Sequence, residues 1–342
     1  MNLDRFRPPG PLRGIVESIG ILVAALITGL AVVAATGGSP IETLRALAYG
    51  SVGNSVNLSS TLVKSVPLAL TGLSVALAFR AGLFNIGGEG QLYVGAAGAA
   101  WIGALELGLP TVLHLPLTVC VGSFLGAVWG GIAGWLKATR GVHEVINTIM
   151  LNYIAIYGVD YLVRGPLGSE IHTARTADII GTSRLPVLWE APPIEVSCGI
   201  VIALVLCFGC WWMLFRMPFG FDIRAVGQNP DAAESVGISS RRVTLLALTL
   251  AGAITGVAGC LEITGVHHTL YAQFSPGYGF DGIAVALLGR SHPIAVIPAA
   301  LLFGALRTAD RWLQLSAGVP KDIVIIIQAV AILAVGLKSK KD

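Results

Sequence analysis

The stretch GLFNIGGEGQLYVGAA, residues 82–97, lies in one of the most apolar parts of the chain, yet it contains Asn85, Glu89 and Gln91. Several glycines are interspersed among these polar residues. A carboxylate at mid-depth in a bilayer costs at least about 2.5–3.5 kcal/mol on insertion scales, so it faces protein or water rather than lipid. Glycine weakens a helix by up to about 1 kcal/mol, and a broken helix is tolerated within a membrane only where it is buried or lines a cavity. The stretch therefore predicts an interrupted, cavity-facing segment over 82–91.

The composition indicates a polytopic membrane protein. Of the 342 residues, 54% are hydrophobic and 12% are charged, whereas a soluble domain carries about 25% charged residues. The net charge of +3 is small, and no basic stripe with interleaved aromatic residues points to nucleic acid. The five cysteines lie mostly in apolar runs, so we expect them to be membrane-core residues rather than a metal or redox site.

Ten apolar segments are candidates to cross about 30 Å of hydrocarbon, although segment 279–289 is short for a span. The first segment is about 20 residues long, which exceeds the roughly 7–15 residues of a signal-peptide core, so we expect it to be retained. The candidate spans are 15–36, 59–79, 86–107, 112–136, 143–164, 195–215, 243–263, 279–289, 293–310 and 320–337.

The distribution of basic residues favours ten crossings with both termini in the cytoplasm. In this topology 14 of the 22 Lys and Arg residues lie inside, seven lie outside, and Lys64 lies within a span. Leaving out 279–289 would move the C-terminal Lys338, Lys340 and Lys341 to the outside. We therefore expect an all-α membrane protein with one transmembrane domain over 1–342.

Five spans in each half would give the two halves opposite orientations in the membrane, as in an inverted repeat. LALTGLSVALA (68–78) weakly matches LALTLAGAITG (246–256). Each precedes a glycine-rich segment with aromatic and acid or amide residues, GLFNIGG (82–88) and GYGFDGI (277–283). We expect the second segment to be the counterpart of the first.

Glycines recur at every fourth position in the fourth span, and two more lie in the seventh. Such a stripe offers a smooth surface on which another helix can pack closely. We therefore expect a close helix–helix contact along it. The glycines are Gly122, Gly126, Gly130 and Gly134, with Gly252 and Gly256 in the seventh span.

Two loops are long enough to have roles of their own. The outer loop 165–194 contains four prolines and charges of both signs, and it is either a passive connector or a lid or docking surface on the extracytoplasmic side. The cytoplasmic loop 216–242 contains a short helix signal. Asn229 suits an N-cap, Pro230 the first helical position, Asp231 the positive helix end and Gly237 a C-terminal stop.

A helix of about two turns is marginal alone in water, so it is expected to pack against something. It is either a capped connector or a docking helix for a cytoplasmic partner. Its residues are Asn229, Pro230, Asp231, Ala232, Ala233, Glu234, Ser235 and Gly237.

Catalytic and nucleotide-binding motifs are missing from the sequence. There is no G-x-x-x-x-G-K-[ST], no H-E-x-x-H and no G-x-S-x-G. His and Cys residues are not spaced as a metal site. We therefore expect no catalytic residues, no bound metal and no cofactor in this chain.

Five segments together resemble the permease subunits of bacterial ABC importers, most closely the branch that imports nucleosides, with simple-sugar importers as relatives. They are GLFNIGGEGQLYVGA (82–96), HEVINTIMLNYIA (143–155), AVGQNPDAAESVGI (225–238), GCLEITGVH (259–267) and GYGFDGIAVALLG (277–289). The segments spread over about 200 residues of the chain.

The resemblance implies a fold like that of vitamin B12-type (type II) importers, with about ten helices per chain, in the bacterial inner membrane. It also implies three partners: a second homologous permease chain, an ATPase that uses ATP and Mg²⁺, and an extracytoplasmic substrate-binding protein or lipoprotein. The helix around Asn229–Gly237 would then be the coupling helix that seats in the ATPase.

Two roles compete for the polar and aromatic residues of the interrupted segments. Asn85 and Gln91 could hydrogen-bond a polar solute while Phe84 and Phe280 stack on a flat base. Alternatively, the carboxylates cap broken helix ends or pair with a buried base such as Lys64, which is the role we favour for them. The candidate pathway residues are Phe84, Asn85, Glu89, Gln91, Asn152, Phe280 and Asp281, with Tyr153 as a further candidate. Glu262, by contrast, is expected near the outer membrane boundary and simply solvated.

The expected function is transport of nucleosides by alternating access, powered by the partner ATPase. One alternative keeps the class and changes the solute to ribose or another simple sugar, because aromatic rings also stack on sugars. Another is a proton-coupled secondary transporter with Glu89 and Asp281 as its relay. The capped cytoplasmic helix argues against the latter, since a secondary transporter has no ATPase to dock.

Overall fold

The computed structural model describes residues 26–35, 37–169 and 174–317, together with positions 326 and 329. The chain divides into two compact units, one formed by the described parts of 1–61 and 302–342, the other by 62–301. The first predicted span is therefore seen only as the helix Leu26–Ala35, and the last, 320–337, lies outside the described residues apart from two positions.

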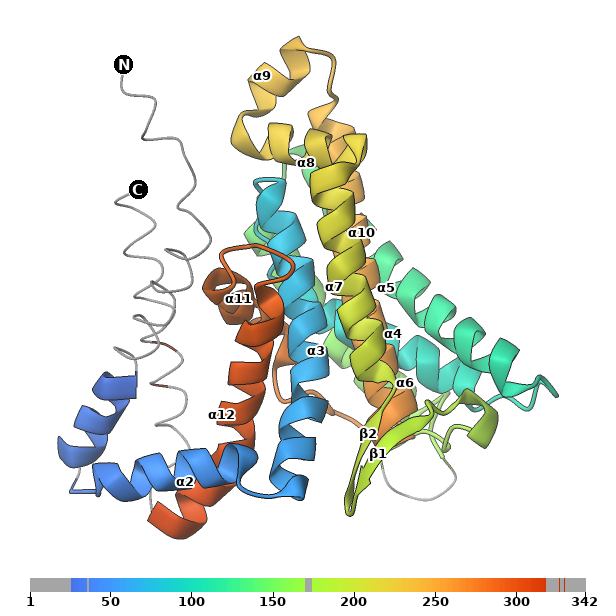
Figure 1. Ribbon diagram of the computed structural model, residues 1–342. Helices are drawn as coiled ribbons and strands as arrows, with labels where there is room; N and C mark the ends of the chain where they lie inside the picture. Colours follow the sequence, from blue (N-terminus) through green and yellow to red (C-terminus); the bar gives the residue numbers. More distant parts are fainter. Residues whose placement is uncertain (1–25, 36, 170–173, 318–325, 327–328, 330–342) are drawn as a thin grey trace. The chain divides into compact units, whose positions relative to one another are not determined.

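The described elements are mostly helices (Figure 1). In chain order they are α2 (Pro40–Val52), α3 (Ser55–Arg80), α4 (Gly88–Gly103), α5 (Thr111–Arg140), α6 (Glu144–Arg164), the 3₁₀ turn η2 (Gly181–Ser183), strands β1 (Val187–Ala191) and β2 (Ile194–Ser197), α7 (Gly199–Arg216), α8 (Pro218–Gln228), α9 (Pro230–Ser235), α10 (Ser240–Glu262), the π-helical turn η3 (Ile263–His267), α11 (Tyr278–Leu288) and α12 (Val296–Ala317).

Five of the described helices are long and apolar enough to cross a membrane: α3, α5, α6, α7 and α10 with η3. This confirms the prediction of a helical membrane protein with several spans. The count of ten is not established by these five, because α4 and α11 are shorter and the two terminal segments are described only in part.

The glycine stripe of α5 packs against α10 as predicted, and α4 lies against both helices. A Cβ atom added at Gly126 would lie 2.5 Å from the carbonyl oxygen of Gly252 and 2.7 Å from the Cα atom of Gly256. Gly95 of α4 approaches the backbone of Gly256 just as closely. The three helices thus meet backbone to backbone, which only glycine permits at these positions.

Among the elements that were not predicted are α2, α8 and the antiparallel β1–β2 hairpin. The hairpin takes up 194–197, so α7 begins at Gly199 rather than at the expected 195. Helix α2 begins with Ser39 as its N-cap, whose hydroxyl accepts a hydrogen bond from the Glu42 backbone N–H at 3.4 Å. The sequence SPIE (39–42) has the Ser and Glu spacing of a capping box.

The unit formed by 26–61 and 302–317 has a small core of its own. Ala46 and Leu47 of α2 pack with Ala309 and Leu313 of α12. The indole N–H of Trp312 donates to Asn57 Oδ1 at 3.2 Å, so this polar side chain is satisfied within the same core.

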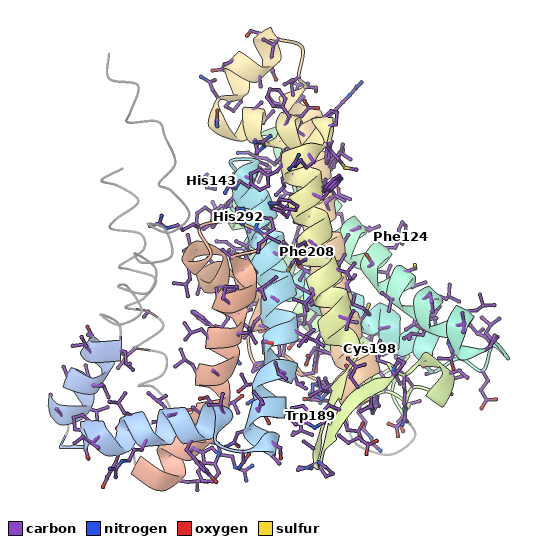
Figure 2. The ribbon with its side chains drawn as sticks, viewed as in Figure 1. Phe124, His143, Trp189, Cys198, Phe208 and His292 are labelled. Carbon is purple, nitrogen blue, oxygen red and sulfur yellow. The ribbon has the colours of Figure 1, made fainter. Side chains whose placement is uncertain are left out.

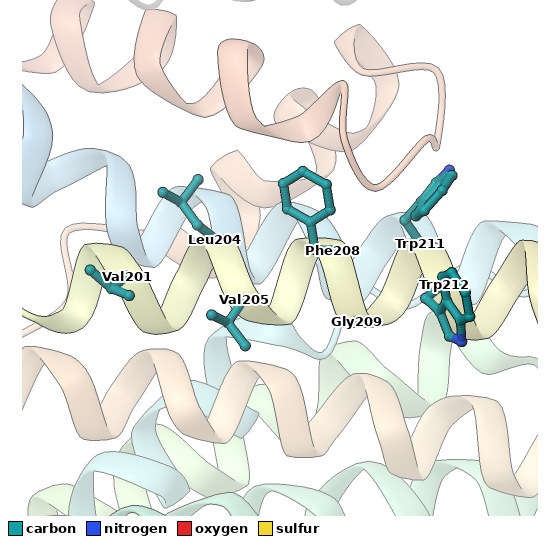
Figure 3. A pocket seen from close by; sticks show the side chains of 7 residues that line it. All are labelled: Val201, Leu204, Val205, Phe208, Gly209, Trp211 and Trp212. Carbon is teal, nitrogen blue, oxygen red and sulfur yellow. The ribbon is translucent and has the colours of Figure 1, made fainter.

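Replacing Gly126 by Ala is expected to destabilise the protein by about 1–3 kcal/mol, because the added methyl group forces α5 away from α10. The matched control is Gly209→Ala on α7, where an added Cβ meets nothing within 4 Å. Figure 3 shows Gly209 in the open apolar groove along α7. Thermal unfolding of the detergent-purified variants measures the difference, and equal midpoints for the two would contradict the packing argument.

Candidate functional site

Two interrupted segments meet inside unit 62–301, and their meeting point is the centre of the candidate site. Helix α3 ends at Arg80 and α4 begins at Gly88, so residues 81–87 are the true interruption, and 88–91 already form the first turn of α4. The start of α11 packs against the start of α4: a Cβ atom on Gly279 would overlap the backbone of Glu89. We call residues 85–91, 152 and 277–279 the helix junction.

Glu89 bridges the two helix starts. Its Oε2 atom accepts a hydrogen bond of 2.7 Å from the backbone N–H of Gly279, and the residue is 3% exposed. Both residues lie in the first turn of their helices, where backbone N–H groups lack partners within the helix and the helix dipole is positive. The carboxylate therefore caps α11 while it sits at the positive end of α4.

Asn152 of α6 caps the other helix start. Its Oδ1 atom accepts from the backbone N–H of Gly90 at 2.8 Å, and its Nδ2 atom donates to the carbonyl of Ile86 at 2.8 Å. The side chain is 1% exposed. One amide thus satisfies a donor of α4 and an acceptor of the preceding turn, and it fixes α6 against the interruption.

Asn85 and Gln91 hydrogen-bond each other and the protein around them. Each amide nitrogen lies 3.3 Å from the amide oxygen of the other residue. Asn85 also accepts from the Gly87 N–H at 3.0 Å and donates to Ser74 Oγ at 3.3 Å. Asn85 is 0% and Gln91 1% exposed, so in this conformation both amides face protein and hold the turn closed.

The aromatic pathway candidates have a different environment. Phe84 is 43% exposed and Phe280 is 45% exposed, while Asp281 is half-buried. The Phe84 ring packs against Phe79 with centroids 4.7 Å apart, which leaves much of its surface open. Apolar rings next to a buried polar junction are therefore the accessible part of the candidate site.

Sequence reasoning missed two hydroxyl groups that complete the junction. Ser74 of α3 donates to the carbonyl of Ala251 at 2.8 Å, and Thr71 Oγ1 lies 3.0 Å from the carbonyl of Tyr278. Small hydroxyl residues inside apolar helices usually bond to their own backbone, so the sequence offered no signal for these long-range contacts.

Glu262 is a second buried carboxylate, although the sequence suggested a solvated residue near the outer boundary. It is 3% exposed and lies 3.4 Å from His267 Nε2. The expectation was wrong because α10 continues into η3, which carries His267 back towards Glu262.

The segment between α6 and α7 is bonded to the residues that follow α10. Backbone N–H groups of Thr176, Ile179 and Leu185 donate to the carbonyls of Leu270, His268 and Thr264 at 2.8, 2.8 and 2.9 Å. Burial, followed by the charge of Arg184, lowers the pKa of His268. The described part of 165–194 is therefore a folded cap over the end of α10.

The segment after α7 forms two helices instead of one. The predicted caps of α9 are confirmed: Asn229 Oδ1 accepts from the Ala232 N–H at 3.0 Å, and Gly237 has a φ of +89°. The N–H groups of Gly237 and Ile238 close the helix end on the carbonyls of Glu234 and Ala233. All of 229–237 except Ala233 is exposed.

Helix α8 packs against the entrance to the interruption. A Cβ atom on Gly227 would overlap the carbonyl oxygen of Arg80, and one on Gly82 would lie 3.2 Å from the Cα atom of Gly227. The guanidinium groups of Arg224 and Arg80 lie 5.2 and 5.6 Å from the ring centroid of Phe215. The α8–α9 hairpin is thereby joined to the turn that leads into the junction.

The α8–α9 hairpin and the folded cap lie at opposite ends of α7 (Figure 1). His143 and His292 lie towards the end that carries α8 and α9, and Trp189 lies at the other end (Figure 2). The junction is therefore connected to one membrane side through Gly227 and to the other through the residues that follow α10.

Replacing Asn152 by Ala is expected to destabilise the protein by about 1–3 kcal/mol for each buried backbone group left without a partner. The control is Met150→Ala on the same helix, since Met150 is 53% exposed. Thermal unfolding of both purified variants tests this. A midpoint for Asn152→Ala as high as that of Met150→Ala would show that the two hydrogen bonds of Asn152 contribute little to stability.

Comparisons with known proteins give the family. Residues 57–336 match the model of the permease component of branched-chain amino acid transport systems. The chain is 37% identical to the guanosine ABC transporter permease protein NupP of Bacillus subtilis, over 92% of this chain and 90% of that protein. It is 34% identical to the nucleoside ABC transporter permease protein NupB of Lactococcus lactis, over 93% and 89%.

A third relative is named for another solute: the glucose ABC transporter permease protein TsgB13 of Haloferax volcanii is 35% identical, over 91% of this chain and 84% of that protein. A solved metal-chelate type ABC transporter in an inward-facing conformation is 14% identical with a TM-score of 0.46, over 97% of this chain and 100% of that one, a likeness too low to bear on the fold. The family match and the 34–37% identities together show that this multi-pass membrane protein belongs to the ABC transporter permease family.

Proposed function

We propose that this chain is one transmembrane subunit of an ATP-driven importer and forms half of a translocation pathway for nucleosides. Family membership supports the transport role, and two of the relatives are named for guanosine or nucleosides. The exposed rings of Phe84 and Phe280 support a solute with a flat base. ATP and Mg²⁺ would be used by a separate ATPase, and the chain itself would bind no cofactor.

Two further partners belong to the proposal. A second, homologous permease chain would supply the other half of the pathway, and a substrate-binding protein would dock on the folded cap between α6 and α7. The proposed topology has both termini in the cytoplasm of a bacterial inner membrane. It has ten spans in two inverted halves with the vitamin B12-type fold, which the meeting of the starts of α4 and α11 supports.

The observation that carries the mechanism is the backbone contact between Gly227 of α8 and the Arg80–Gly82 turn. The exposed, doubly capped α9 suits docking to an ATPase. Movement of α8 would then act directly on the turn that leads into the helix junction. Phe84, Phe280 and Asp281 would line the pathway, while Asn85, Glu89, Gln91 and Asn152 would shape its wall.

The glucose-named relative favours a simple sugar as the second candidate solute. Sequence identity does not separate the two, since it is 35% for that protein and 37% and 34% for the others. A proton-coupled transporter is a weaker alternative, because Glu89 already holds a backbone N–H in the first turn of α11 and protonation would weaken that bond.

Uptake of labelled guanosine into proteoliposomes tests the proposal. They would contain this chain, its partner permease, the ATPase and the binding protein. We expect uptake that requires ATP, persists with an ionophore and resists excess ribose and glucose. Competition by either sugar would move the assignment to the sugar branch. Uptake by this chain alone, abolished by the ionophore, would overturn the importer proposal.

Replacing Gly227 by Ala is expected to lower uptake at least about tenfold while the ATPase still assembles and hydrolyses ATP, because α8 can no longer sit against the Arg80 carbonyl. ATP hydrolysis and uptake are measured on the same vesicles. The control is Gly209→Ala on α7, where an added Cβ meets nothing within 4 Å. Unchanged uptake would show that the contact transmits no movement.

A further inference from the structure

Helix α6 has two faces of different character. Its buried face, which includes Asn147, Asn152 and Val159, packs against α4 and α5. On the opposite face Tyr153, Tyr157 and Tyr161 are 53, 66 and 71% exposed. They recur every fourth residue, and the rings of Tyr153 and Tyr157 are 21° from parallel with centroids 6.4 Å apart. We call these three residues the tyrosine track.

The hydroxyl groups of the track are the unusual feature. Within the part of the chain that the structure describes, none of the three has a hydrogen-bond partner. A hydroxyl in hydrocarbon loses its bonds to water without replacement. Tyr161 lies near the end of α6 and could belong to an interfacial aromatic belt. Tyr153 lies at the middle of Glu144–Arg164, where no such belt occurs.

Two other spans expose side chains that suit contact with lipid. The middle of α5 exposes Phe124, Val128 and Ile132, and α7 exposes Val205 and Phe208. Phe124 and Phe208 are labelled in Figure 2, and Figure 3 shows the α7 face lined by aliphatic and aromatic side chains. Neither surface has a hydroxyl group at these positions. The track therefore differs from these apolar surfaces of α5 and α7 by its hydroxyl groups.

The two ends of the track lie at different depths along α6. Tyr153 follows Asn152, which clamps the helix junction. At the other end Asp160 is paired with Arg164 at 2.9 Å, and its Oδ1 atom has no hydrogen bond among the described residues. The Arg164 end faces the side that carries the folded cap, since α6 begins at the His143 side (Figure 2). The track thus extends along α6 from the end that carries the folded cap to the level of Asn152, on the opposite face of the helix.

We infer that the tyrosine track lines a water-filled part of the pathway and binds the nucleoside on its way across the membrane. Each ring stacks on the flat base, and each hydroxyl hydrogen-bonds the base or the ribose. Rings one helical turn apart give the solute successive equivalent positions, so no single position holds it tightly. This inference rests on the proposed function and names residues that contact its substrate.

Water access to the track is the first test, because it does not depend on transport. Tyr157→Cys and the control Phe208→Cys are placed in a chain with Cys120→Ser and Cys198→Ser, which removes the cysteines that are not buried. The assembled importer in proteoliposomes is treated with a charged methanethiosulfonate. We expect Tyr157→Cys to react at least about tenfold faster than Phe208→Cys, as water-filled access requires, and guanosine to slow its reaction. Equal rates would place the face against lipid or another chain and overturn the inference.

Uptake kinetics provide the second test. Tyr157→Ala is expected to raise KM for guanosine about tenfold, the loss of one base–aromatic stack, while Tyr157→Phe keeps the ring and loses less. Phe208→Ala should leave KM unchanged. If Tyr157→Ala lowers the yield of assembled importer, the same comparison is made with Tyr157→Phe, Tyr153→Phe and Tyr161→Phe, which keep the shape of the side chain.

The outcomes separate the track from the proposed function. If glucose instead of guanosine slows the reaction of Tyr157→Cys and is taken up, the result supports the role of the track and overturns the nucleoside assignment. Two results together would overturn the proposed role of the tyrosine track. No solute would slow the reaction of Tyr157→Cys with the methanethiosulfonate, and KM would be unchanged in every tyrosine variant. These results would leave the importer assignment in place, since the unmodified chain would still import its solute.

Discussion

The start of α11 meets the start of α4 inside an apolar protein, and the backbone N–H groups there must be satisfied without water. The Glu89 carboxylate meets this constraint with its 2.7 Å bond to Gly279. Two positive helix ends that face each other would repel, and a negative charge between them turns the arrangement into an attractive one. Glycine is needed at position 279 because the backbones come too close for a side chain. The rest of the junction depends on this contact.

Burial of the polar residues changes what the site can do. Asn85, Gln91 and Asn152 use their amide groups on one another and on the backbone, so they define the shape of the wall instead of offering free groups to a solute. In the proposed pathway, recognition would then be left to the exposed rings, which bind flat or apolar surfaces weakly and with little directional demand. Weak contact suits a subunit that receives its solute from a binding protein, because tight capture would slow release.

Local signals were readable from the sequence, and contacts between distant segments were not. The caps of α9 depend on Asn229, Pro230 and Gly237, which act within one turn, so they were predicted with their roles. The glycine stripe of α5 was also readable, since its period fixes one helix face. The hydrogen bonds of Asn85 with Gln91 and Ser74 depend on how α3 and α4 pack against each other. Neither composition nor residue spacing determines that packing. Glu262 was misjudged because a π-helical turn is not visible in hydrophobic periodicity.

The contacts around the junction differ in how readily they can change, and this difference bears on alternating access. Gly227 meets Gly82 and Arg80 through backbone surfaces without interlocking side chains, so small sliding at this contact breaks few interactions. The Glu89–Gly279 bond is buried and charge-assisted, and breaking it would leave a carboxylate without that partner in a low-dielectric interior. Asn152 adds two further bonds that tie α6 to the same group. We therefore expect the junction and α6 to move as one body, with α8 sliding against it at the glycine contact.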